Sequence, residues 1–308
     1  MNEISLRVIF MGTPEFAVAS LQALVERGIP VVAVITAPDK PRGRGRKIGH
    51  SPVKEYALSQ GLPVLQPTNL KSAEFLEELR SYRADLQIVV AFRMLPEAVW
   101  DMPPRGTFNL HASLLPQYRG AAPINWAIIN GETETGVTTF RIQHAIDTGN
   151  ILFQEPELIH PNDTAGTLYE RLMHRGAALV VRSARAIAAD DYTLFPQPEV
   201  DELKEAPKLQ RETCRINWQQ PAENVRNFVR GLSPYPAAWT TFDERQCKLF
   251  TVADTGITNA SLTPGQYVTD NKTYLHIKAL DTLVAVHDLQ LEGKRRLPIN
   301  EFLRGNSL

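Results

Sequence analysis

Short apolar runs alternate with amphipathic helical segments along residues 1–189 of this 308-residue chain. The runs are rich in β-branched residues and lack a polar face, which is typical of strands buried on both sides in a parallel sheet. The expected strands are residues 6–11, 31–36, 86–91, 107–111, 136–142 and 151–158, and the expected helices are residues 15–27, 52–60, 72–82 and 164–189. This order predicts an α/β fold with a doubly wound, mostly parallel sheet.

The last third of the chain has a different pattern. Residues 190–206 are rich in Pro, Asp and Glu and show no helical or strand period, which indicates a linker. An expected helix at residues 222–231 is followed by strand-like segments at 238–242, 248–253, 266–268, 274–278 and 283–290. Short strands separated by turn residues predict a smaller β-barrel-like domain of OB type. We therefore expect a first domain at 1–189, a linker at 190–206 and a second domain at 207–308.

The net charge of the chain hides a marked asymmetry. The chain carries 33 Lys and Arg against 34 Asp and Glu, a net charge of −1. Residues 207–308 carry 13 against 10, or +3, and residues 1–206 carry 20 against 24, or −4. Within the acidic part, residues 38–54 hold six basic side chains and one acidic one, or +5. Such a local concentration decides the partner more than the sum does.

The basic stretch places arginines between glycines, in the order Arg42-Gly43-Arg44-Gly45-Arg46-Lys47. Glycine allows the backbone to bend, and the guanidinium fork suits phosphate oxygens. A mobile loop that contacts phosphates, with RNA as one candidate partner, is therefore one interpretation. A solvated loop without a partner is the alternative, and charge alone does not separate the two.

Cysteine usage and hydropathy exclude several classes of protein. The two cysteines, Cys214 and Cys247, have no metal-binding or redox spacing, so we expect a reducing cytoplasm and neither a disulfide framework nor a structural zinc site. No run of about 18 apolar residues exists, so we expect no membrane span.

Two polar side chains stand two positions apart at the end of an expected strand. Asn109 and His111 share one face of that strand, and the carboxyl ends of parallel strands are where open α/β sheets place their sites. An amide donor beside an imidazole can stabilise an oxyanion and shuttle a proton. Asp147 precedes a Thr-Gly turn. Its carboxylate could orient that imidazole, favour the protonated form of the imidazole, or accept a proton itself. A satisfied histidine and ordinary Asn and Asp turns are the alternatives.

Other chemistries find less support. The first turn contains only Gly12 of a dinucleotide-binding fingerprint, and Pro14 removes an amide donor there. His111, His144 and Asp147 lack the spacing of metal ligands, so we expect no metal. Ser113 does not lie in a Gly-x-Ser-x-Gly turn, the motif that exposes a nucleophilic serine hydroxyl.

Four segments stand in a fixed order along the chain: GTPEFA at 12–17, the basic loop with SPVK at 51–54, NLHASLLPQYRGAAP at 109–123 and DTG at 147–149. Taken together, they resemble the methionyl-tRNA formyltransferase family, and the resemblance extends over nearly the whole chain. The Asn-x-His-x-Ser-Leu-Leu-Pro segment is specific for the wider folate-dependent formyltransferase group. The basic loop followed by SPVK narrows the resemblance to the tRNA enzyme.

The resemblance implies transfer of a formyl group from 10-formyltetrahydrofolate to methionine on initiator methionyl-tRNA, which leaves tetrahydrofolate. It implies that the catalytic group is Asn109, His111 and Asp147. The folate site would include Ser113, Leu114, Leu115 and Pro116. The tRNA-binding loop would include Arg42, Gly43, Arg44 and Lys47. The C-terminal domain would bind the acceptor arm of the tRNA. We expect a cytoplasmic monomer.

Two departures from the family pattern concern small residues. The chain reads Ala91-Phe92-Arg93 where the family commonly has Tyr-Gly, and it has Ala112 in place of a common Gly. The first departure bears on the shape of the folate pocket. The rival interpretations are a formyltransferase for an amino sugar nucleotide or glycinamide ribonucleotide, and a non-catalytic RNA-binding module.

Overall fold

The computed structural model describes residues 6–42 and 47–306 of the chain. The chain forms two compact units. The first unit consists of Met1–Arg119, Gly136–Glu157 and Tyr169–Lys204, and the second of Gly120–Thr135, Leu158–Leu168 and Glu205–Leu308. The domain boundaries expected from the sequence stay a prediction.

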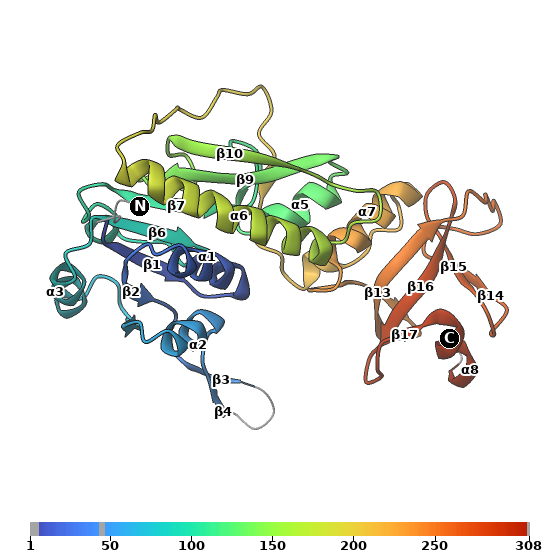
Figure 1. Cartoon of the computed structure of the whole chain (residues 1–308). Helices are drawn as coiled ribbons and strands as arrows, with labels where there is room; N and C mark the ends of the chain where they lie inside the picture. Colours follow the sequence, from blue (N-terminus) through green and yellow to red (C-terminus); the bar gives the residue numbers. More distant parts are fainter. Residues whose placement is uncertain (1–5, 43–46, 307–308) are drawn as a thin grey trace. The chain divides into compact units, whose positions relative to one another are not determined.

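A seven-stranded sheet forms the centre of the first unit, in the order β10-β9-β7-β6-β1-β2-β5 (Figure 1). Its strands are β1 (Val8–Gly12), β2 (Val31–Ile35), β5 (Val64–Leu65), β6 (Leu86–Val90), β7 (Thr107–His111), β9 (Glu134–Arg141) and β10 (Ile151–Leu158). The pairs from β5 to β7 are all parallel, and β9 joins β7 in antiparallel register. The predicted doubly wound, mostly parallel sheet is confirmed.

Helices cover both faces of this sheet. They are α1 (Glu15–Glu26), α2 (Pro52–Ser59), α3 (Ala73–Ser81), α4 (Glu97–Trp100) and α6 (Ala165–Ala188). The ring of Phe16 on α1 meets that of Tyr169 on α6 at 5.2 Å, so these two helices share a face. Buried Phe75 of α3 and Val99 of α4 pack with Ile9 of β1, a side chain of the opposite face. The strands are therefore buried on both sides, as their apolar runs require.

Side-chain caps explain where two of these helices begin. The Ser51 hydroxyl accepts a hydrogen bond from the Lys54 amide at 3.1 Å, and the Ser72 hydroxyl accepts one from the Phe75 amide at 3.4 Å. Each cap satisfies one of the backbone donors that a helix leaves unpaired at its start. The sequence SPVK thus starts α2 directly after the basic stretch.

The ends of the basic stretch form a small hairpin rather than a loop throughout. β3 (Lys40–Arg42) pairs with β4 (Lys47–Gly49) in antiparallel register. Pro41 fits this arrangement because a two-stranded sheet consists of edge strands, where proline is tolerated. Gly43 and Arg44 lie outside the described residues, as do the side chains of Arg42 and Lys47.

The second unit contains an antiparallel half-barrel in the order β12-β13-β16-β15-β14, with β17 paired to β16. The strands are β12 (Ala238–Phe242), β13 (Arg245–Asp254), β14 (Tyr267–Thr269), β15 (Leu275–Lys278), β16 (Leu283–Leu291) and β17 (Leu297–Pro298). The helices are α5 (Pro123–Ile129), α7 (Ala222–Leu232) and α8 (Ile299–Gly305). The short elements are β11 (Glu205–Ala206), the 3-10 turn η1 (Glu212–Cys214) and β8 (Arg119–Gly120), whose first residue belongs to the first unit. The predicted barrel-like second sheet is confirmed.

A single apolar cluster holds this half-barrel together. Val225 and Val229 of α7 pack with Leu249 of β13 and Leu289 of β16, and Phe302 of α8 is fully buried with them. The two helices therefore pack with apolar side chains of the sheet and remove them from water.

Candidate active site

Three loops meet at one edge of the parallel sheet. Gly12 at the end of β1 pairs with Val90 of β6, and Val90 pairs with Leu110 of β7. The loops that follow these strands therefore start side by side, at the edge where open α/β sheets bind their ligands. The Asn-x-His segment belongs to the third of these loops and its strand.

Asn109 and His111 lie at the C-terminal end of β7 and differ in burial and in hydrogen bonding. His111 is 6% exposed, and its Nε2 lies 2.8 Å from the carbonyl oxygen of Tyr118. A carbonyl only accepts, so Nε2 carries the proton of this bond and Nδ1 faces the other way. Asn109 is half-buried, and within the described part of the chain its side-chain amide has no hydrogen-bond partner. That amide is available to a substrate oxygen.

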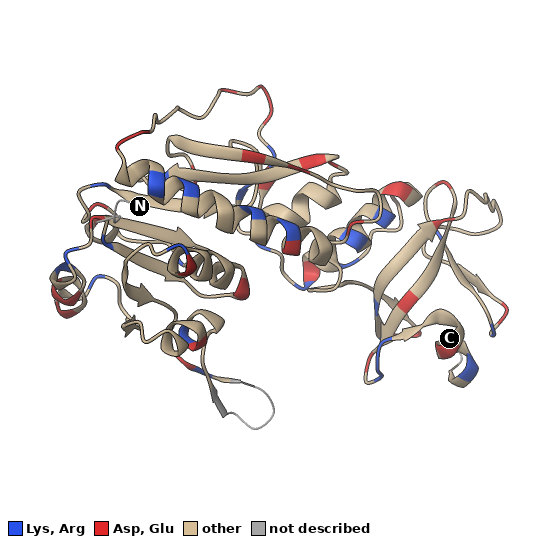
Figure 2. Cartoon of the chain, in the orientation of Figure 1, with Lys and Arg blue, Asp and Glu red and all other residues tan. Residues whose placement is uncertain are grey.

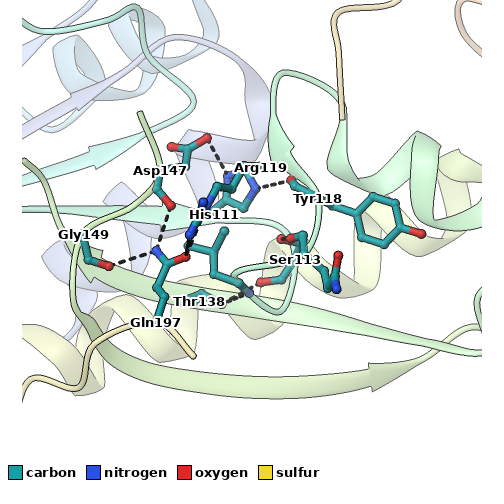
Figure 3. Close-up of polar contacts among 10 residues, drawn as sticks. His111, Ser113, Tyr118, Arg119, Thr138, Asp147, Gly149 and Gln197 are labelled. Carbon is teal, nitrogen blue, oxygen red and sulfur yellow. Dashed lines mark hydrogen bonds and ion pairs between the residues drawn. The ribbon is translucent and has the colours of Figure 1, made fainter. Parts of the chain in front are cut away.

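Asp147 approaches His111 from the loop between β9 and β10. Its Oδ2 lies 3.9 Å from Nδ1 of His111, and the two side chains are 14% and 7% exposed. This distance is longer than a hydrogen bond, so no direct hydrogen bond joins the two groups. Figure 3 shows the carboxylate and the imidazole directed toward one another. The structure thus brings together His111 and Asp147, which are 36 positions apart in the sequence.

Two residues that the sequence did not single out complete this arrangement. The amide group of Gln197 donates to the carbonyl oxygens of Asp147 and Gly149, at 2.8 and 2.9 Å. Its oxygen accepts from Nε and Nη2 of Arg119, at 3.1 and 2.6 Å. Gln197 lies in a Pro-rich segment without period, so nothing in the sequence around it signalled this role.

Hydrogen bonds from two hydroxyl groups to backbone carbonyls hold the predicted folate segment in place. The Ser113 hydroxyl donates to the carbonyl of Gln117 at 2.6 Å, and the Thr138 hydroxyl donates to the carbonyl of Ser113 at 2.7 Å. Ser113, Leu115 and Pro116 are buried, and Leu114 is half-buried. Only Leu114 of the four therefore presents much of its side chain to a ligand.

The departure after β6 has a defined conformation. Ala91 adopts a φ of +47°, a left-handed conformation that favours glycine. The Arg93 guanidinium donates to the carbonyls of Pro67 and Thr68, so the loop is tied to the neighbouring segment. Phe92 is half-buried beside Arg93, whose guanidinium carbon lies 5.7 Å from the ring centre. The altered sequence is thus held in one conformation by these contacts.

A charged cluster anchors the basic hairpin at its base. The ammonium of Lys54 contacts the carboxylate of Asp39 and donates to Oε1 of Gln66 at 2.7 Å. The hydrogen bond from Lys54, followed by that from Gln66, holds the pKa of Asp39 well below its usual range. Asp39 therefore stays ionised at the foot of the hairpin and offsets one of its positive charges.

The structure also bears on the excluded chemistries. Cys214 and Cys247 are free and buried, and burial raises the pKa of Cys247 to about 12. Across residues 6–42 and 47–306, no three His, Cys, Asp or Glu side chains are placed to hold a metal ion. None of the helices in these same residues is long and apolar enough to cross a membrane.

Comparisons with known proteins agree with this geometry. Residues 6–184 match the formyl transferase family model, and residues 208–307 match that of the formyl transferase C-terminal domain. A methionyl-tRNA formyltransferase from Bacteroides fragilis is 53% identical over 313 residues, which cover 99% of this chain and 96% of the relative.

Solved structures share the fold at lower identity. HypX from Aquifex aeolicus, in complex with tetrahydrofolic acid, superposes with a TM-score of 0.66 at 19% identity, over 97% of this chain and 48% of HypX. An N-formyltransferase from Helicobacter canadensis, in complex with folinic acid and dTDP-3-aminofucose, gives 0.67 at 22% identity, over 91% and 98%. The whole-length identity to the Bacteroides protein, rather than these structures, decides the family: this chain belongs to the methionyl-tRNA formyltransferases.

Proposed function

We propose that this protein transfers the formyl group of 10-formyltetrahydrofolate to the amino group of methionine on initiator methionyl-tRNA. The products are N-formylmethionyl-tRNA, which serves translation initiation, and tetrahydrofolate. The observation that carries the proposal is the His111–Asp147 pair at 3.9 Å, with the Asn109 amide two residues from His111 and without a hydrogen-bond partner among the described residues. An imidazole, a carboxylate and a free amide donor at one edge are what acyl transfer to an amine requires.

The reaction needs no covalent enzyme intermediate. The methionine amine attacks the formyl carbon, its nitrogen bonds to that carbon, and the carbonyl oxygen becomes an oxyanion. Asn109 and protonated His111 donate hydrogen bonds to the oxyanion, and Asp147 stabilises the charge on His111. As the bond to folate N10 breaks, the amine proton leaves with the help of Asp147 and ends on N10.

The folate substrate would lie along the loops at the carboxyl edge. Leu114 would offer an apolar side chain to it, and Phe92 would form the opposite wall. Ser113, Leu115 and Pro116 would set the position of Leu114, since all three are buried.

The tRNA would meet two basic regions. Arg42, Gly43, Arg44 and Lys47 belong to the hairpin that we assign to the acceptor end. In the second unit, the guanidinium carbons of Arg211 and Arg215 lie 6.0 and 5.5 Å from the ring centre of Trp239, and Lys248 pairs with Trp239 in the sheet. Arginines stacked at an aromatic ring suit a nucleic-acid backbone. We thus assign catalysis to residues 1–189 and acceptor-arm binding to 207–308.

The buried free cysteines support a reducing compartment. A cytoplasmic location and a monomeric state remain part of the proposal.

The experiment that tests the proposal supplies labelled 10-formyltetrahydrofolate with three acceptors in separate reactions. These are methionyl initiator tRNA, an amino sugar nucleotide and glycinamide ribonucleotide. We expect transfer to the tRNA alone. Transfer to a small acceptor instead would favour the rival formyltransferases, and tRNA binding without any transfer would favour the RNA-binding module.

A further inference from the structure

The segment expected to be a linker makes specific contacts in the first unit. Phe195 exchanges two backbone hydrogen bonds with Ile151, at 2.7 and 2.9 Å. Further along, the carbonyl of Lys204 accepts from the amide of Tyr118 at 2.6 Å, and Gln117 bonds to the backbone of Glu202 and Lys204. We call residues 195–204 the strap. Both ends of the strap are therefore bonded next to the two loops that supply the site.

Gln197 is the strap residue that reaches the Asp147 loop. Its amide nitrogen has two hydrogens, and both are donated, to the carbonyls of Asp147 and Gly149. Its oxygen accepts twice, both times from Arg119. The full hydrogen-bonding capacity of the side chain is thus used in one place. Figure 3 shows Gln197 between Arg119 and the Asp147–Gly149 backbone.

The Asp147 loop needs such a support. Asp147 has a φ of +53°, and residues 143–146 are exposed. In the exposed part of the loop, the Gln143 amide donates to the Thr148 hydroxyl, which itself donates to the Ala145 carbonyl, and His144 pairs with Glu97 at 3.2 Å. Exposed pairs of this kind contribute little rigidity. Gln197 adds half-buried hydrogen bonds to the backbone of Asp147 and Gly149.

Resting on the proposed function, we infer that Gln197 is a positioning residue that sets the separation between Asp147 and His111. Tyr118 holds Nε2 of His111, and the next residue, Arg119, holds Gln197, which holds Asp147. The contacts close a ring around the 3.9 Å gap. The gap is too long for a direct hydrogen bond between the two side chains, and we assign its length to this ring of contacts.

The test uses two substitutions at Gln197 in the full-length protein. In Gln197→Glu, the side chain keeps its size and its acceptor for Arg119 but loses both N–H donors. In Gln197→Ala, all four bonds are lost. We expect both variants to lower kcat by about 10- to 100-fold, because small displacements of reacting groups have effects of this size. We expect KM for the tRNA and for the folate to stay within about threefold of wild type, since neither is held by this residue.

Two comparisons separate positioning from general loosening. Gln117→Ala removes strap contacts away from Asp147 and is expected to change kcat by less than about twofold. In an Asp147→Asn background, Gln197→Ala is expected to have little further effect, because Gln197 acts through Asp147.

A Gln197→Glu protein with wild-type kcat, or additive effects in the double variant, would overturn the inference. So would an equal loss in Gln117→Ala. A wild-type protein that transfers no formyl group to methionyl-tRNA would overturn the proposed function instead, so the two failures are distinct. Folding of each variant is followed by its Tm, and Gln197→Asn, which keeps an amide one methylene shorter, is expected to give an intermediate kcat.

Discussion

Asn109 and His111 stand on one face of β7, two residues apart, and the proposed chemistry depends on both. Removing one oxyanion donor costs about 10²–10³-fold in rate. We expect Asn109→Ala and His111→Ala each to lower kcat for formyl transfer by at least this factor. The affinity for methionyl-tRNA, measured by filter binding, should stay unchanged because neither side chain belongs to the basic regions. Near-normal turnover in either variant contradicts the assignment.

What the sequence could predict at this scale follows from the range of the interactions. Asn109 and His111 are two residues apart, so strand geometry alone places them together. Asp147 was predicted from its Thr-Gly turn and the family resemblance. Gln197 and Arg119 meet across 78 positions through a segment without period, and no local pattern reports such a contact. The ring around the site therefore required the structure.

At the scale of elements, β10 and α6 are joined by a charge network. Glu157 of β10 pairs with Arg171 and Arg175 of α6, and Arg182 pairs with Glu155. Figure 2 shows basic residues in blue along α6. Burial raises the pKa of Glu157, but the hydrogen bonds from the two arginines outweigh it and hold that pKa below its ordinary value.

The depressed pKa of Glu157 predicts a pH dependence of stability. A carboxyl whose pKa is lower in the folded state stabilises the fold above its unfolded pKa, about 4.3, and loses this contribution as pH falls through the folded value. We expect Glu157→Gln to lower the free energy of unfolding by about 1–3 kcal/mol at pH 7. Urea unfolding at a series of pH values should show the difference from wild type narrowing below about pH 4. A difference that grows on acidification would contradict this.

The contact of α5 with α7 depends on a missing side chain. A Cβ at Gly231 would lie 2.7 Å from Cγ1 of Ile129 and 3.0 Å from the carbonyl oxygen of Asn125. The Asn125 amide also donates to the Gly231 carbonyl at 2.8 Å. We expect Gly231→Ala to destabilise the protein by about 1–3 kcal/mol in thermal or urea unfolding. Gly305→Ala is the control, because a Cβ there meets no atom within 4 Å, and a larger loss at Gly305 would refute the packing argument.

Element prediction succeeded where period and length were clear. The expected strand at 107–111 and the expected helix at 164–189 agree with β7 and α6 to within one residue at each end. The β3–β4 hairpin was missed because its two strands have only three residues each, too few to show a hydrophobic period. The short helix α5 was missed because its seven residues are too few to show a period.

For the whole molecule, the division of charge is the feature that the proposed function explains. The −4 of residues 1–206 surrounds a +5 stretch, and residues 207–308 carry +3. A folate site needs no such basic regions, whereas an RNA backbone does.

This division predicts the salt dependence of binding. The affinity for methionyl-tRNA should fall steeply with salt, since each phosphate contact releases counterions. Replacing both Arg42 and Arg44 by Ala should weaken binding and flatten the plot of log affinity against log salt by about one unit per lost contact. An unchanged slope would show that the basic stretch touches no phosphates.

Formyl transfer from 10-formyltetrahydrofolate, measured side by side on methionyl initiator tRNA and methionyl elongator tRNA, tests the central claim most directly. We predict fast, folate-dependent formation of N-formylmethionyl-tRNA with the initiator and far slower formation with the elongator. Equal rates on both tRNAs, or no transfer to either, would contradict the account.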